Sequence, residues 1–191
     1  IKPTPAIGGV GLIKNYKKMI TMNFKNTGNQ VLVIGKTEGH IDQSLFARTV
    51  LNEKNGPPPE VNLFNEKNNG ETLLNLIDRN YIKSAHDVSL GGIITAISKM
   101  CIKGNKGIEL RIPKFLINET EYFFAEDQGR YIIEVSLEDL KNVTKILDKN
   151  SVHYDQIGKI IDKDLIINQK TKVTIDELKS YNTNWLKDYM V

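Results

Sequence analysis

The sequence has 191 residues, of which 40% are hydrophobic and 26% are charged, and its formal net charge is +3. This composition is typical of a globular protein and excludes a disordered or fibrous chain. No apolar run approaches the roughly 20 residues of a membrane-spanning helix. The 26 lysines and arginines are scattered among 23 acidic residues without a block of like charge. We therefore expect neither nucleic-acid binding nor membrane binding.

Cysteine and histidine are too sparse for a disulfide or a zinc site of the usual spacing. Cys101 is the single cysteine and lies in an apolar helical pattern, which favours a buried thiol in a reducing, cytoplasmic compartment. The three histidines, His40, His86 and His153, are far apart and have no companion cysteines, so we expect no metal site. The chain begins at Ile1 without a leader pattern, which predicts a piece of a larger protein.

The first third of the chain is predicted to hold extended segments followed by two helices. Residues 31–34 form a short apolar, β-branched run after a turn at residues 26–29, which is typical of a strand. The expected elements are extended segments at 6–13, 18–24 and 30–34, a helix from Asp42 or Ser44 with Asn55-Gly56 as its stop, and a helix over 63–80, which Asn68-Asn69-Gly70 would interrupt or delay.

From residue 81 onward, strands and helices alternate. A short extended piece at 81–89 passes through Gly91-Gly92 into an apolar helical pattern at 93–100. The expected elements after it are a strand at 107–112, a helix at 118–124, a strand at 131–135, a helix from Ser136 to 147, strands at 154–161 and 165–167, and a last helix from Thr174 or Asp176. This order predicts a layered α/β (α+β) fold with a mixed sheet.

The first candidate site is the run from His86 to Gly92. A strand that ends in a glycine turn before a helix brings free backbone N–H groups to the positive helix end, which suits a phosphate. The candidates for nucleotide or substrate binding are His86, Asp87, Ser89, Gly91 and Gly92, at the sheet edge where α/β proteins usually bind ligands. The alternative is a packing turn in which Asp87 or Ser89 caps the helix. Spacing alone favours this alternative, because such turns are common.

The second candidate site is the loop Glu126-Asp127-Gln128-Gly129-Arg130, directly before a predicted strand. Adjacent carboxylates, an amide and a guanidinium on one loop could hold Mg²⁺, a phosphate or a sugar hydroxyl. The alternative is a solvated turn with an internal pair between the arginine and a carboxylate. We add Glu126, Asp127, Gln128 and Arg130 to the candidate binding residues.

A third glycine-rich run, from Pro3 to Gly11, superficially suggests a phosphate loop. It lacks the Lys-Ser/Thr ending of that loop, and no strong helical pattern follows it. An extended strand with close backbone packing is the favoured interpretation.

In this order, the three runs resemble the C-terminal part of the phosphoribosylformylglycinamidine synthase family, ATP-dependent amidotransferases within the AIR synthase-related superfamily. Pro3–Gly11 is similar to the last strand region of the family's second ATP-binding-type domain. Ser84–Gly92 is similar to the signature His-Asp-Val-Ser-(Asp/Glu)-Gly-Gly, and Ala125–Arg130 to Gly-Glu-Ser-Gln-(Ser/Gly)-Arg. A strand at 157–160 and a final helix with Trp185 also match in position. The resemblance covers nearly the whole chain.

The resemblance implies an AIR-synthase C-terminal-like domain at 28–191, preceded at 1–27 by the tail of an AIR-synthase N-terminal-like domain. It implies ligase chemistry in purine biosynthesis: ATP phosphorylates the amide oxygen of formylglycinamide ribonucleotide, and ammonia from glutamine displaces the phosphate to give the amidine. The family's catalytic histidine, main Mg²⁺ ligands and nucleotide loop lie upstream of Ile1. The resemblance therefore implies no catalytic or metal-binding residue here, an inactive segment in isolation, and ATP and Mg²⁺ bound mainly upstream.

The same resemblance implies the partners. These are the upstream domains of the same polypeptide, a glutaminase subunit and a small accessory subunit. No nucleic acid and no membrane are among them.

The sequence departs from the family pattern at three positions: Leu90 replaces an acid, Ala125 a glycine and Asp127 a serine. In the family only the first of two related halves makes the substrate contact through this loop, and the present chain matches the second half. Two alternatives remain open. One is a non-catalytic structural or interaction domain with a degenerate nucleotide site. The other is a different superfamily member, such as an aminoimidazole ribonucleotide synthetase, a selenophosphate synthetase or a hydrogenase-maturation protein.

Overall fold

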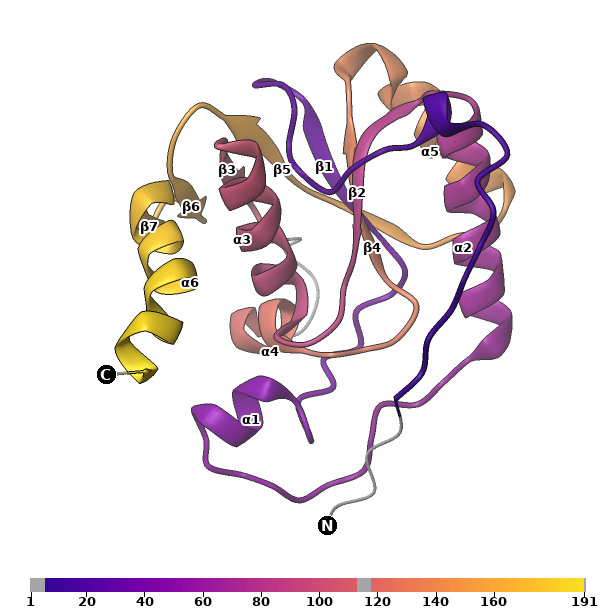
Figure 1. Ribbon diagram of the computed structural model, residues 1–191. Helices are drawn as coiled ribbons and strands as arrows, with labels where there is room; N and C mark the ends of the chain where they lie inside the picture. The colour runs from indigo at the N-terminus through magenta and orange to yellow at the C-terminus, as the bar shows by residue number, and fades with distance from the viewer. Residues whose placement is uncertain (1–5, 113–117, 191) are drawn as a thin grey trace.

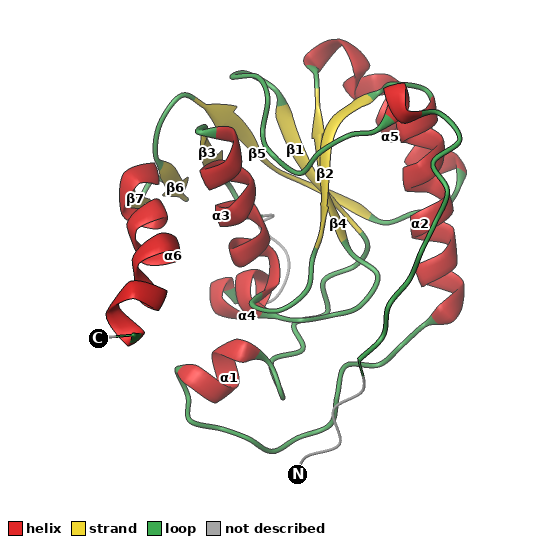
Figure 2. Ribbon diagram, in the orientation of Figure 1, coloured by secondary structure: helices red, strands yellow, loops and turns green. Residues whose placement is uncertain are grey.

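The fold is a mixed β-sheet with helices on both faces (Figures 1 and 2). The computed structural model describes residues 6–112 and 118–190. In chain order its elements are η1 (Tyr16–Lys18), β1 (Gln30–Ile34), α1 (Leu45–Thr49), α2 (Leu63–Asp78), β2 (Ile82–Asp87), α3 (Gly92–Gly104), β3 (Gly107–Leu110), α4 (Glu119–Phe124), β4 (Tyr131–Val135), α5 (Leu137–Lys149), β5 (Tyr154–Ile161), β6 (Leu165–Ile167), β7 (Thr171–Val173) and α6 (Ile175–Tyr189).

The seven strands of the described residues follow the order β2-β4-β1-β5-β3-β6-β7. The pairings are antiparallel except for β3 with β6, which is parallel. Strand β1 is an interior strand, paired on both sides, and its five residues are all buried. Because successive side chains of a strand point to opposite faces, a strand buried throughout requires a layer of helices on each side.

Two separate apolar cores, one on each face of the sheet, bury the side chains of β1. Val31 and Val33 of β1 belong to the core beneath α3, α4 and α6, which includes Ile97 and Met100. Leu32 and Ile34 of the same strand belong to the opposite core beneath α2 and α5. In Figure 2 the two groups of helices lie on opposite sides of the sheet. The α/β class with a mixed sheet, predicted from the sequence, is confirmed.

The elements with the clearest periodicity were predicted well. Helix α5 begins after Ser136, whose side chain accepts a hydrogen bond from the Asp139 amide, as an N-cap should. Thr174 caps α6 and Ser44 caps α1 in the same way, which settles the two open choices of cap. Helix α2 is continuous through Asn69, so the predicted interruption there is wrong.

The strip before β1 differs more from the prediction. Residues 6–13 are exposed and form no strand, and Thr21 makes a single isolated bridge with Ser84. The start of the glycine-rich run, Pro3 to Pro5, lies outside the described residues. Strand β7, which was not predicted, pairs with β6. Among the described residues, no helix has both the length and the apolar character needed to cross a membrane.

A buried carboxylate joins this strip to the sheet. Glu134 of β4 is fully buried, and its two oxygens accept hydrogen bonds from the Lys25 amide at 2.9 Å and the Asn26 amide at 3.0 Å. The Asn29 side-chain amide at 2.7 Å and the Ser84 hydroxyl at 2.9 Å complete the set. Four donors compensate the loss of water around the charge, so the residue is satisfied although it lies inside the sheet.

Replacing Glu134 with alanine should lower the free energy of unfolding by about 3 kcal/mol or more, because buried donors lose their shared acceptor. Equilibrium urea unfolding of the chain measures the change. The matched control is Glu71→Ala, which removes an exposed carboxylate of α2 and should cost less than about 0.5 kcal/mol. Equal losses in the two variants would contradict the structural role of Glu134.

Cys101 should be unreactive in the folded protein. Its thiol is buried on α3, and burial raises its pKa from 9.0 to about 12, so the nucleophilic thiolate is scarce near neutral pH. We expect no reaction with a thiol-directed chromogenic disulfide until urea unfolds the chain. Fast labelling of the native protein would contradict this burial.

The raised pKa of Cys101 also predicts a pH dependence of stability, because the thiol of the unfolded chain ionises at lower pH than the buried thiol. The free energy of unfolding should be unaffected by this group below pH 9.0 and should fall as the pH rises towards about 12.

Candidate functional site

The glycine turn between β2 and α3 forms one side of the candidate site. Gly91 and Gly92 both have positive φ, at 82° and 69°, a region that residues with a Cβ avoid. A Cβ on Gly92 would also lie 2.5 Å from the Phe123 carbonyl oxygen and 2.7 Å from that of Ala125. The turn therefore needs glycine to let the segment after α4 pack against it. The N-cap residue of α3 is Gly91, which has no side chain to cap the helix, so the predicted cap by Asp87 or Ser89 is wrong.

The free amide of this turn is occupied by the second candidate loop. The Gly91 N–H donates to Glu126 Oε1 at 2.8 Å. The Leu45 N–H, at the start of α1, donates to the same oxygen at 2.7 Å. The structure thus brings the two predicted candidate sites together. The Glu126 carboxylate of the second site lies beside the N-terminus of α3, the helix that follows the glycine turn of the first.

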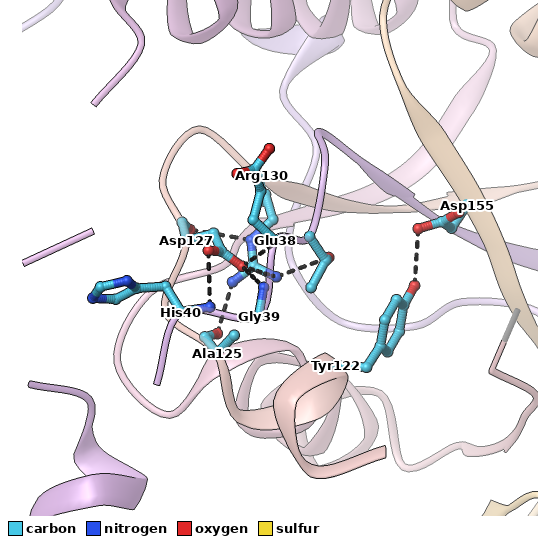
Figure 3. A network of polar contacts seen from close by, with 9 residues as sticks. Glu38, Gly39, His40, Tyr122, Ala125, Asp127, Arg130 and Asp155 are labelled. Carbon is cyan, nitrogen blue, oxygen red and sulfur yellow. Dashed lines mark hydrogen bonds and ion pairs between the residues drawn. The ribbon is translucent and has the colours of Figure 1, made fainter. Parts of the chain in front are cut away.

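Asp127 makes a second set of contacts with backbone amides. Its carboxylate accepts hydrogen bonds from Glu38 at 3.0 Å, Gly39 at 3.1 Å and His40 at 3.2 Å, which are drawn in Figure 3. Three consecutive amides that converge on one carboxylate form a strong, charge-assisted arrangement. With only 8% of its surface exposed, Asp127 fixes the loop that follows β1.

Arg130 lies in the centre of the same network (Figure 3) and is 1% exposed. Its guanidinium donates to the carbonyl oxygens of Ala125 at 2.7 Å and Asp127 at 3.1 Å, and to the Thr37 hydroxyl at 3.0 Å. Burial lowers the pKa of Arg130, and the nearby charge of Asp127 acts in the opposite direction; the guanidinium stays charged. The predicted pair between arginine and carboxylate is present at 3.8 Å, but it is buried rather than solvated.

The remaining predicted residues make fewer contacts with the rest of the domain. Asp87, Ser89 and Gln128 are exposed. His86 Nδ1 lies 3.0 Å from Asp87 Oδ1, while His86 Nε2 is buried and has no hydrogen-bond partner among the described residues. An imidazole in this position can donate or accept one further hydrogen bond.

A polar cavity of about 620 Å³ lies beside Asp127 and Gln128. Its walls come from the loop after β1, the first half of α2 and the loop before β5. The residues that line it are Gly35, Lys36, Glu38, Gly39, His40, Glu60, Asn62, Asn65, Glu66, Asn69, Asp127, Gln128, Ser151 and His153. Most of them were not among the sequence-predicted candidates. The signal that could have found part of this wall is the spacing of Asn62, Asn65 and Asn69 on one face of a helix.

His153 stands at the border of this cavity, next to the part-buried Asp155. Its Nε2 lies 3.7 Å from Asp155 Oδ1, and the Tyr122 hydroxyl donates to Asp155 Oδ2 at 3.1 Å, a contact drawn in Figure 3. Burial, followed by the charge of Asp155, raises the pKa of Tyr122, so the phenol remains a donor. Among the described residues, no group of three or more His, Cys, Asp or Glu side chains is placed to hold a metal ion.

The mixed sheet with helices on both faces, and the glycine turn bonded to Glu126, belong to a known class of domain. The family model described as AIR synthase related protein, C-terminal domain, matches residues 26–168. The chain belongs to this family.

Curated relatives match the chain from end to end. The Pelagibacter ubique protein named phosphoribosylformylglycinamidine synthase subunit PurL is 68% identical over 190 residues, which is 100% of this chain and 26% of that protein. The Bartonella henselae protein of the same name is 35% identical over the same shares. The chain thus spans about a quarter of the length of these relatives.

Solved structures share the fold at low identity. Thermotoga maritima PurL complexed with FGAR gives a TM-score of 0.73 at 20% identity, over 85% of this chain and 30% of that one. Escherichia coli HypE, a hydrogenase maturation protein, gives 0.59 at 17% identity, over 82% of this chain and 52% of that one. At such identities these similarities support the fold alone.

Replacing Asp127 with alanine should destabilise the chain by about 3 kcal/mol, since three amides lose a charged acceptor and Arg130 loses its neighbouring charge. Thermal or urea unfolding measures the loss. Gln128→Ala is the matched control in the same loop, because its side chain is exposed, and it should change stability by less than about 0.5 kcal/mol. A neutral Asp127→Ala variant would contradict the structural role of this carboxylate.

Proposed function

We propose that this chain is the C-terminal part of a phosphoribosylformylglycinamidine synthase. The observation that carries the proposal is the 68% identity to a relative of that name, which extends over the whole chain. The similarity in fold to HypE is much lower in identity, so another superfamily member is the less supported alternative.

The proposed reaction is the ATP-dependent conversion of formylglycinamide ribonucleotide and ammonia into formylglycinamidine ribonucleotide, a step of purine biosynthesis in the cytoplasm. Solved PurL structures similar in fold are complexes with ATP and with ADP, which supports ATP as the nucleotide. Mg²⁺ would neutralise charge during phosphoryl transfer. The proposal places the ligands of this ion mainly in the upstream domains of the same polypeptide.

The proposal of a preceding domain, with a boundary near residue 27, is supported by the exposure of residues 6–13. Ile7, Val10 and Leu12 are 93%, 106% and 95% exposed, which is unusual for three large apolar side chains in one segment. The proposal assigns residues 1–27 to the tail of the preceding domain and 28–191 to the C-terminal-like domain. Upstream domains of the same polypeptide would cover the strip.

The proposed partners are a glutaminase subunit and a small accessory subunit. A solved T. maritima structure described as PurLQS, one chain of which has a TM-score of 0.67 to this chain, supports a complex of several subunits. Ammonia would then come from glutamine in the glutaminase subunit.

Within this proposal, the role of the present segment is to support the cleft rather than to catalyse. The nucleotide or substrate contacts proposed for His86, Asp87, Ser89, Gly91 and Gly92 compete with a structural role for the same turn. The hydrogen bond from Gly91 to Glu126 favours the structural role, as does the burial of Asp127 and Arg130.

Reconstitution tests the proposed function. The full-length protein, supplied with ATP, Mg²⁺, ammonium and formylglycinamide ribonucleotide, should form the amidine and ADP, as followed by mass spectrometry and a coupled ADP assay. The 191-residue chain under identical conditions should form neither product. Absence of amidine with the full-length protein would refute the activity, whereas turnover by the isolated chain would refute only the supporting role of this segment.

A further inference from the structure

Glu126 connects its own loop to two segments that are distant in sequence. Its Oε1 atom accepts hydrogen bonds from the Leu45 amide at 2.7 Å and the Gly91 amide at 2.8 Å. Its own amide donates to the His40 carbonyl oxygen at 3.1 Å. One carboxylate oxygen therefore holds both the first residue of α1 and the residue directly before α3.

The energetics of the two helices explain why this contact matters. Gly91 occupies the N-cap position of α3 and has no side chain that could cap the helix. Glu126 accepts the hydrogen bond of the Gly91 amide and places a negative charge at the positive helix end. Helix α1 has only five residues, too few to be stable by itself. Its other attachments are the cap by Ser44 and the contact between the rings of Phe46 and Phe124, with centroids 4.7 Å apart.

We propose that Glu126 is an intramolecular latch, which docks α1 onto the Gly91-Gly92 turn and keeps the turn closed to anionic ligands. The carboxylate takes the position in which an oxygen of a bound anion would accept the Gly91 hydrogen bond. The two N–H groups share one acceptor atom, so loss of that atom releases the turn and α1 together. This inference concerns the conformation of the domain and does not depend on the proposed reaction.

The test is hydrogen exchange of the full-length protein, followed by mass spectrometry of peptides that cover residues 44–50 and 88–93. In Glu126→Ala both peptides should exchange about tenfold faster or more, because each loses a charge-assisted hydrogen bond. In Gln128→Ala, the control from the same loop, both should exchange at the wild-type rate. Inorganic phosphate, compared with chloride at equal ionic strength, should leave exchange of the wild-type turn unchanged.

A second variant breaks only one arm of the latch. Leu45→Pro removes the Leu45 N–H at the first helical position, where proline is well tolerated. The preceding Ser44 has φ −65° and ψ 163°, a conformation compatible with a following proline. Exchange in 44–50 should rise, while 88–93 should remain slow because Gly91 keeps its acceptor.

The outcomes separate the latch from other roles. Joint acceleration in Glu126→Ala, with acceleration of α1 alone in Leu45→Pro, supports it. If Glu126→Ala unfolds the protein globally, the Leu45→Pro pattern decides. Wild-type rates at either peptide in a folded Glu126→Ala protein would overturn the latch, as would wild-type rates at α1 in Leu45→Pro. Protection of the wild-type turn by phosphate would overturn its closure to anions.

Discussion

The loops at one end of the sheet depend on a single constraint, the buried guanidinium of Arg130 just before β4. A cation in a nearly water-free position is stable only if its donors are matched and a negative charge lies near. The carbonyl oxygens of Ala125 and Asp127 and the Asp127 carboxylate meet this requirement, which forces the loop to curl around the arginine. The same curl aims Asp127 at the amides after β1 and places Glu126 between α1 and the glycine turn.

Elements with a regular apolar pattern were predicted from the sequence, and those without one were not. Helix α5 and strand β4 combine a clear period with buried apolar side chains, so their positions were expected. Strand β7 is three mostly exposed residues, and only its pairing with β6 makes it a strand. The side-chain contact at the start of α3 was mispredicted, because the acceptor of the Gly91 amide is Glu126, 35 residues away in sequence. Local sequence carries no signal for such a long-range partner, and the same holds for the cavity walls.

Family and site were predictable to different degrees. Three ordered runs pointed to the AIR synthase-related superfamily, and the match over residues 26–168 confirms it. The chemistry of those runs was harder to assign, because carboxylates and glycines that suit a phosphate also suit a tight internal junction. In this chain, Asp127 and Arg130 are consumed by internal contacts, whereas Asp87, Ser89 and Gln128 remain exposed. Whether a polar motif faces a ligand or its own backbone is decided by tertiary packing, which spacing does not encode.

The four hydrogen bonds of Glu134 have a mechanical consequence. They attach residues 25–29 to the interior of the sheet through β4, and through Ser84 to the edge strand β2. The strip before Lys25 therefore leaves the domain at a point that hydrogen bonds fix to the sheet. One carboxylate inside the sheet thus fixes the point at which this strip meets the domain.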